Sequence, residues 1–178
     1  MERNREKTQK ARFRVVVDTS VLIAGAISTK GYAFDLLKLL VKGNVVNYAS
    51  SRTLHEYKAK MQSKKVLKHL SMDEAMKYFE IMLTFSKRIS IKKSFQKNKH
   101  IKELVKDEKD IPFLDVAYNA KAEFLITYDR RHLLKIRDKT RRFKLNSREF
   151  YILTSKEFIK EFYESNKRKS VKVLAKLF

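Results

Sequence analysis

Short apolar runs alternate with amphipathic stretches along most of this chain. Residues 13–17 form a continuous, largely β-branched run, which is typical of a strand buried on both faces. Similar short runs predict further strands at residues 45–49, 89–91, 124–127 and 150–153. Apolar residues at helical spacing predict helices at residues 20–27, 32–42, 52–62, 72–87, 111–121, 132–136 and 156–165. This alternation predicts an α/β fold: a single three-layer α/β/α domain with a central parallel sheet.

The segments outside these elements set the predicted domain limits. A length of 178 residues corresponds to about one domain. We expect the globular domain at residues 13–165, after a basic N-terminal arm at 1–12 and before a basic, amphipathic tail at 166–178. The polar and basic stretch 92–109 is the best candidate for a mobile loop.

The tail is unusually apolar for a chain end. Its apolar residues are Val171, Val173, Leu174, Leu177 and Phe178. They are too many for a free tail, so they predict contact with a second copy of the chain in a homodimer. The alternative is a last helix that folds back on its own domain.

Composition narrows the class of partner. The formal net charge of +22 indicates an anionic partner, and nucleic acid is the commonest one. A membrane surface is a weaker alternative, and a merely solvated charged surface is another. The absence of cysteine excludes disulfides and thiolate sites and fits the cytoplasm. The charged stretch 1–14 lacks the apolar run of a signal peptide, and no window is apolar enough to cross a membrane.

Four acidic residues stand where ligand-binding groups collect in such folds. Asp18 directly follows the first strand, and Asp129 follows the strand at 124–127. Asp110 precedes a predicted helix, and Glu56 lies on the helix after the second strand. In an open parallel sheet, ligands bind outside the carboxyl ends of the strands. Carboxylates gathered there repel one another unless a cation joins them, and Mg²⁺ or Mn²⁺ prefers oxygen ligands.

Each acid also has a purely structural interpretation. Asp18 could be a turn residue, Asp110 could cap its helix, and Glu56 could pair with Lys60 one turn later. Asp115 lies among apolar residues, so it is either a buried hydrogen-bonded carboxylate or a group that supports the ligating acids. Asp107 is a weaker candidate ligand. Among the histidines, His132 is the first to consider, because it follows Asp129 by three residues.

A basic segment begins beside Asp129. Residues 130–148 carry nine positive side chains and one negative. Such a cluster can follow a phosphate backbone, although a solvated charged linker is the alternative. The predicted nucleic-acid contacts are Arg130, Arg131, Arg137, Arg141 and Arg142.

The acids and their surroundings match a known family. The chain resembles PIN-domain ribonucleases over roughly residues 13–155. The segments that carry the resemblance are 15–23, 51–57, 107–117 and 124–129. The resemblance implies that Asp18, Glu56, Asp110 and Asp129 bind metal and catalyse. It also implies a supporting hydroxyl at Thr127. One departure is Ser20, where many members carry Asn; Ser keeps a hydroxyl for hydrogen bonding.

These observations predict a metal-dependent endoribonuclease that acts on RNA. The insert around residues 58–109 resembles the larger toxin-like archaeal and bacterial members, which implies an antitoxin protein as a partner. The alternatives are an RNA-processing or ribosome-assembly nuclease and a non-catalytic nucleic-acid-binding protein. A phosphatase of the haloacid dehalogenase type needs a second Asp where Ser20 stands, and a receiver domain does not need so basic a surface.

Overall fold

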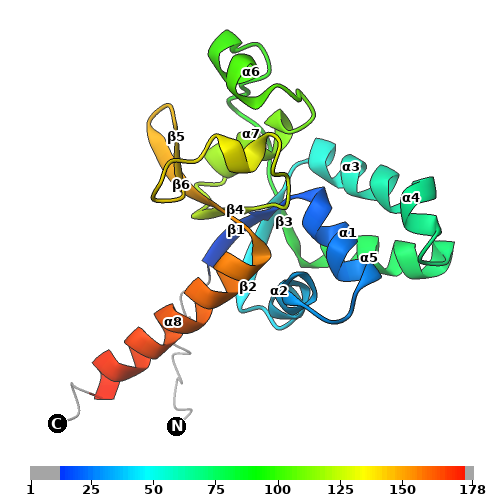
Figure 1. Cartoon of the computed structure of the whole chain (residues 1–178), viewed down its shortest axis with the longest axis horizontal. Coiled ribbons are helices and arrows are strands. Elements are labelled where there is room, and N and C mark those ends of the chain that lie inside the picture. The colour runs from blue at the N-terminus through cyan, green and yellow to red at the C-terminus, as the bar shows by residue number, and fades with distance from the viewer. Residues whose placement is uncertain (1–12, 175–178) are drawn as a thin grey trace, which may run out of the picture.

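The computed structural model describes residues 13–174, and side chains for residues 13–168 (Figure 1). The predicted arm at 1–12 and the last four residues of the predicted tail lie outside this range. No helix of the described part is long and apolar enough to cross a membrane.

A six-stranded sheet forms the middle of the molecule, in the order β3-β2-β1-β4-β6-β5. The strands are β1 (Phe13–Val17), β2 (Val45–Ala49), β3 (Ser86–Arg88), β4 (Phe124–Ile126), β5 (Arg142–Leu145) and β6 (Arg148–Leu153). All neighbours pair in parallel except β5 and β6. The three-layer α/β/α prediction is therefore confirmed, with one antiparallel edge strand added.

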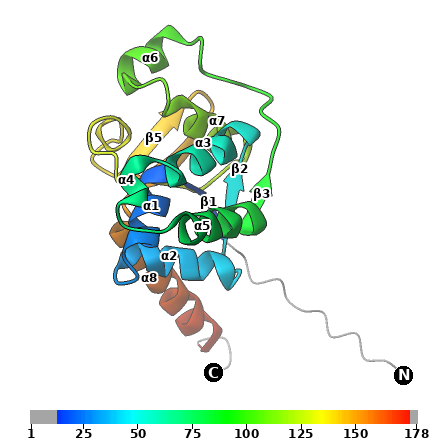
Figure 2. The ribbon, with the colours of Figure 1, turned by 90° about the vertical axis from the view of Figure 1, so that its right-hand side faces the viewer.

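Helices cover both faces of the sheet. They are α1 (Thr19–Ile27), α2 (Tyr32–Val41), α3 (Ser51–Met61), α4 (Lys64–Leu67), α5 (Met72–Phe85), α6 (Lys99–Val105), α7 (Ile111–Asn119) and α8 (Ser155–Leu174), with a 3₁₀ turn at Leu133–Lys135. Helices α2 and α8 lie side by side on one face, and α7 packs on β1, β2 and β4 on the other (Figures 1 and 2).

The core explains why these elements assemble. Val15, Val16 and Val17 of β1 are buried because β1 is the third strand of six and both of its faces are covered. Aromatic rings join α8 to the sheet, with the Phe158 ring 5.2 Å from the Phe124 ring and in an edge-to-face arrangement. The predicted bounds of β1 and β2 are confirmed.

Several elements differ from the prediction. Helix α5 ends at Phe85, so the edge strand β3 covers residues 86–88 and not 89–91. The stretch 92–109 contains α6, whose Ile101 and Val105 are buried. Strand β5 lies inside the predicted basic segment: its buried Phe143 and Leu145 alternate with exposed basic residues. Helix α8 continues through the predicted domain limit at residue 165 to Leu174.

Candidate active site

The candidate acids gather at the carboxyl edge of the two strands at the centre of the sheet. Strands β1 and β4 are parallel neighbours, and Val17 is in register with Ile126. The backbone N–H of Asp18 donates to the carbonyl of Ile126 at 2.9 Å. Asp18 and Thr127 therefore leave the sheet at the same level, and Asp129 follows two residues later.

Two hydroxyl groups fix Asp18 to the loop after β4. The Thr127 hydroxyl donates to Asp18 Oδ2 at 2.7 Å and accepts from the backbone N–H of Asp129 at 2.9 Å. The Ser20 hydroxyl also donates to Asp18 Oδ2, and it accepts from the backbone N–H of Tyr128 at 3.0 Å. Because each hydroxyl both donates and accepts a hydrogen bond, Asp18 and the 127–129 loop are held in one orientation.

Glu56 approaches the same edge from α3. The hydroxyl of Thr19 donates to Glu56 Oε1 at 2.8 Å. Its neighbour Tyr57 is fully buried, and its hydroxyl donates to the carbonyl of Val17 at the end of β1. These two contacts attach the start of α1 and the end of β1 to the helix that carries Glu56.

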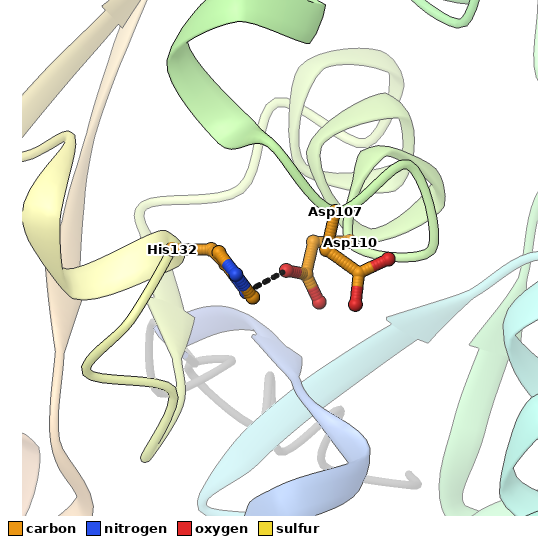
Figure 3. Close-up of side chains that lie close together, drawn as sticks. All are labelled: Asp107, Asp110 and His132. Atoms are coloured by element: carbon orange, nitrogen blue, oxygen red, sulfur yellow. Dashed lines mark ion pairs between the residues drawn. The ribbon is translucent and has the colours of Figure 1, made fainter.

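Asp110 occupies the N-cap position of α7, but its side chain makes no capping hydrogen bond. The predicted N-cap position is therefore confirmed, but the carboxylate does not cap the helix. Its Oδ2 atom is buried and has no hydrogen-bond partner. His132 Nδ1 lies 3.3 Å from that oxygen and 2.9 Å from Asp129 Oδ2. Figure 3 shows the imidazole directed at Asp110, with Asp107 beside it.

The crowding of carboxylates perturbs their protonation. Burial raises the pKa of Asp110 to about 8, and the hydrogen bond with Asp129 and the charges of Asp18 and Asp129 add to the rise. Burial also raises the pKa of Asp18, against the lowering effect of the Ser20 and Thr127 hydroxyls. For Asp129 burial acts upward, but the backbone N–H groups of Arg131 and His132 lower its pKa overall.

The residues present fit a divalent cation. The ligand atoms of Asp107, Asp110 and His132 lie within 4.8 Å of one another, the one such group in the described part of the chain. A cation relieves the charge repulsion among Asp18, Asp110 and Asp129. Oxygen-rich donors of this kind suit Mg²⁺ or Mn²⁺.

Asp115 does not support these acids. Its carboxylate accepts from the Ser94 hydroxyl at 2.7 Å and from the backbone N–H of Phe95 at 2.8 Å. Both partners belong to the loop before α6, so the expected support for the ligating acids is wrong. Asp115 is the other alternative, a buried hydrogen-bonded carboxylate that anchors that loop.

The predicted nucleic-acid residues divide into two groups. Arg130, Arg131 and Arg141 are exposed. Arg137 instead makes a bidentate pair with Glu157, at 2.9 and 3.2 Å, and donates to the carbonyl of Ile152. Its expected RNA contact is therefore replaced by a structural one.

Arg142 also has partners within the protein. It pairs with Glu149 at 3.1 Å and stacks on Tyr151 with its guanidinium carbon 5.1 Å from the ring centroid. Beyond Arg142 the segment leaves the acids. Leu145 pairs with Arg148 at the start of β6. At 3.3 Å per residue, this start lies roughly 17 Å from the carboxyl end of β6. The second half of the predicted track along 130–148 therefore runs away from the acids, and contact of this segment with RNA stays a prediction.

Several residues of this site are not evident from the sequence. Thr19 and Tyr57 carry no sequence signal beyond their neighbours Asp18 and Glu56, because their contacts depend on tertiary packing. The spacing of His132 from Asp129 does indicate their contact, and Asp107 is a minor candidate that the structure places beside Asp110.

Comparisons with known proteins agree with the geometry. A family model described as "PIN domain" matches residues 14–131. An uncharacterized protein, MJ1680, of Methanocaldococcus jannaschii is 34% identical over 157 residues, which cover 88% of this chain and 96% of the relative.

Proposed function

The chain belongs to the PIN-domain family, and on that premise we propose that it is a metal-dependent endoribonuclease. PIN domains are generally nucleases, and the acidic edge of this sheet has the form that such chemistry requires. The substrate class, RNA, and the metal, Mg²⁺ or Mn²⁺, belong to this proposal. The single observation that carries it is the crowding of the carboxylates of Asp18, Asp110 and Asp129 at the carboxyl ends of β1 and β4.

The proposed roles follow from the contacts. Asp18, Asp110 and Asp129 would supply oxygen ligands to the ion, and Glu56 approaches from α3. A bound divalent ion would neutralise phosphate charge and lower the pKa of a water that it coordinates. Ser20 and Thr127 keep Asp18 oriented, so the site loses little entropy when it binds. His132 holds the carboxylates of Asp110 and Asp129 together.

Charge supports RNA as the substrate class. A net charge of +22 attracts a polyanion, whereas the site itself is acidic and needs a cation before a phosphate can enter. The exposed Arg130 and Arg131 follow Asp129 directly and are placed to meet phosphates beside the site. Basic charge fits any nucleic-acid partner, and the acidic group beside it favours a nuclease over a protein that only binds.

Cleavage of a labelled single-stranded RNA tests the proposal. We expect cleavage with Mg²⁺ or Mn²⁺, none in EDTA, and a loss of at least roughly a hundredfold in Asp18→Asn, which removes a ligand charge at almost constant volume. The matched control is Asp35→Asn, an equal charge change at a half-buried α2 residue that pairs with Lys38 away from the site. Equal cleavage by Asp18→Asn and wild type would refute the metal site, and binding without cleavage would leave a nucleic-acid-binding protein.

The biological setting of this activity is a separate proposal. A toxin of a toxin–antitoxin pair would be inhibited by the product of a short neighbouring open reading frame. An RNA-processing nuclease would instead cleave a defined precursor without such an inhibitor. Co-purification of this chain with the product of a neighbouring frame, and the loss of cleavage in the complex, would identify a toxin.

A further inference from the structure

A second cationic surface lies away from the acids, on the face of the molecule that carries α7. A groove of about 610 Å³ is bordered by basic side chains from three separate segments. They are Lys92 and Lys93 in the loop after β3, Lys121 in the turn between α7 and β4, and Arg148 at the start of β6. None of the described residues that line the groove is acidic.

These charges are not compensated within the protein. In the described part of the chain, none of the four cations forms an ion pair, whereas Arg14, Arg137 and Arg142 all do. Two of the four meet at one aromatic ring: Lys93 Nζ lies 5.4 Å and the Arg148 guanidinium carbon 5.1 Å from the centroid of Tyr118. Arg148 Nε is buried without a hydrogen-bond partner. Like charges held together in this way attract an anion.

The groove is held in place before any ligand arrives. Asn119 Oδ1 accepts from the backbone N–H groups of Lys92 and Lys93, both at 3.0 Å. Asn119 Nδ2 donates to the carbonyls of Lys93 and Asp115, both at 2.7 Å. These four hydrogen bonds fix the backbone that carries Lys92 and Lys93, which lowers the entropy cost of binding there.

The position of the groove suggests what fills it. Helix α7 begins beside Asp110 and ends at Asn119, so the groove lies roughly 13 Å along the helix from the acids at 1.5 Å per residue. That is about four steps of a nucleic-acid strand at 3.4 Å per step. The carboxyl end of α7 adds only about half a negative charge, which is small beside four positive ones.

A neighbouring hollow connects the two regions. It is lined in part by Arg52, Arg88, Ile89 and Ser90, and it shares Ile89 and Ser90 with the groove. Arg52 lies in the first turn of α3, one turn before Glu56. A basic path therefore runs from the helix that carries Glu56 to the far end of α7.

We propose that this groove binds the phosphate backbone of RNA a few nucleotides away from the cleaved bond. The reference to a cleaved bond rests on the proposed nuclease function. The binding of RNA in the groove does not depend on it. It predicts that the enzyme recognises RNA length: a short oligonucleotide reaches the acids only, and a longer one also fills the groove.

The test compares two double variants of equal charge. Lys92→Gln/Lys93→Gln alters the groove, and Lys64→Gln/Lys65→Gln alters two exposed lysines of α4. Binding of single-stranded RNA of about 20 nucleotides is measured by fluorescence anisotropy in EDTA across a KCl series. We expect the groove variant to lose about 1.4 units of salt slope, at about 0.7 per phosphate contact, and several-fold in affinity. The α4 variant should behave as wild type does.

The outcomes separate this proposal from the nuclease assignment. An unchanged salt slope in the groove variant, or a loss equal to that of the α4 variant, would overturn the groove. Cleavage with Mn²⁺ is then measured on RNA of about 4 and about 20 nucleotides, and KM should rise for the longer RNA alone. If wild type cleaves neither RNA but the binding loss persists, the nuclease proposal fails and the groove remains.

Discussion

Asp110 should make the metal-free protein less stable than its amide variant. Its pKa is raised from an ordinary value of 3.8 to about 8, chiefly by burial. A raised pKa means that the folded state binds the proton more tightly than the unfolded state does. The stabilising contribution is therefore complete below pH 4 and is lost as the pH rises to about 8. At neutral pH, burial opposes ionisation of the Asp110 carboxyl group, and Asp110→Asn removes this unfavourable free energy from the folded state.

The magnitude follows from the size of the shift. Between the ordinary pKa of 3.8 and pH 7 lie about three pH units, which at roughly 1.4 kcal/mol each give a ceiling of about 4 kcal/mol. The Asn amide must itself be desolvated, so we expect about half, or ~2 kcal/mol. For a chain of this length, that raises Tm by about 4–8 °C.

Thermal and urea unfolding in EDTA at pH 5 and pH 8 provide the measurement. Asp110→Asn should be the more stable protein at pH 8, and the difference should shrink at pH 5, while nuclease activity is lost at both. The control is Asp138→Asn, an exposed acid whose pKa is lowered, first by the backbone N–H of Arg142. Its replacement should destabilise equally at pH 5 and pH 8, because this carboxylate is ionised at both. An Asp110→Asn protein no more stable than wild type at pH 8 would refute the reasoning.

Three further perturbations test other parts of the structure. Arg137→Ala, which breaks the bidentate pair with Glu157, should cost about 1–2 kcal/mol in urea unfolding and leave RNA affinity unchanged in anisotropy. Tyr57→Phe leaves the buried carbonyl of Val17 without its donor, so it should cost about 1–3 kcal/mol and reduce cleavage by misplacing Glu56; activity equal to wild type would show that this contact does not position the site. Truncation after Asn166 should lower the mass measured by light scattering if the C-terminal segment forms the predicted homodimer, and an unchanged mass would exclude that contact.

Local patterns were sufficient for the central elements. Strands β1 and β2 are short apolar runs, and burial on both faces favours such residues at those positions. The edge strands were displaced or missed. Strand β3 is polar and three residues long, and it is a strand because β2 offers it hydrogen bonds. Strand β5 does show an alternating pattern, but its exposed basic residues are equally typical of a nucleic-acid-binding segment.

The sequence by itself determined the α/β class and the placement of the acids at strand and helix ends, because both depend on residues adjacent in the chain. Tertiary structure decided which charged groups act together. Asp115 and Asp110 lie on one helix, yet packing directs the former to the Ser94 loop and the latter to His132. Tertiary packing also pairs Arg137 with Glu157 and places Lys93 and Arg148 over the ring of Tyr118. Charge acts through space over a few ångströms, so the partner of a charged side chain is known only when the chain is folded.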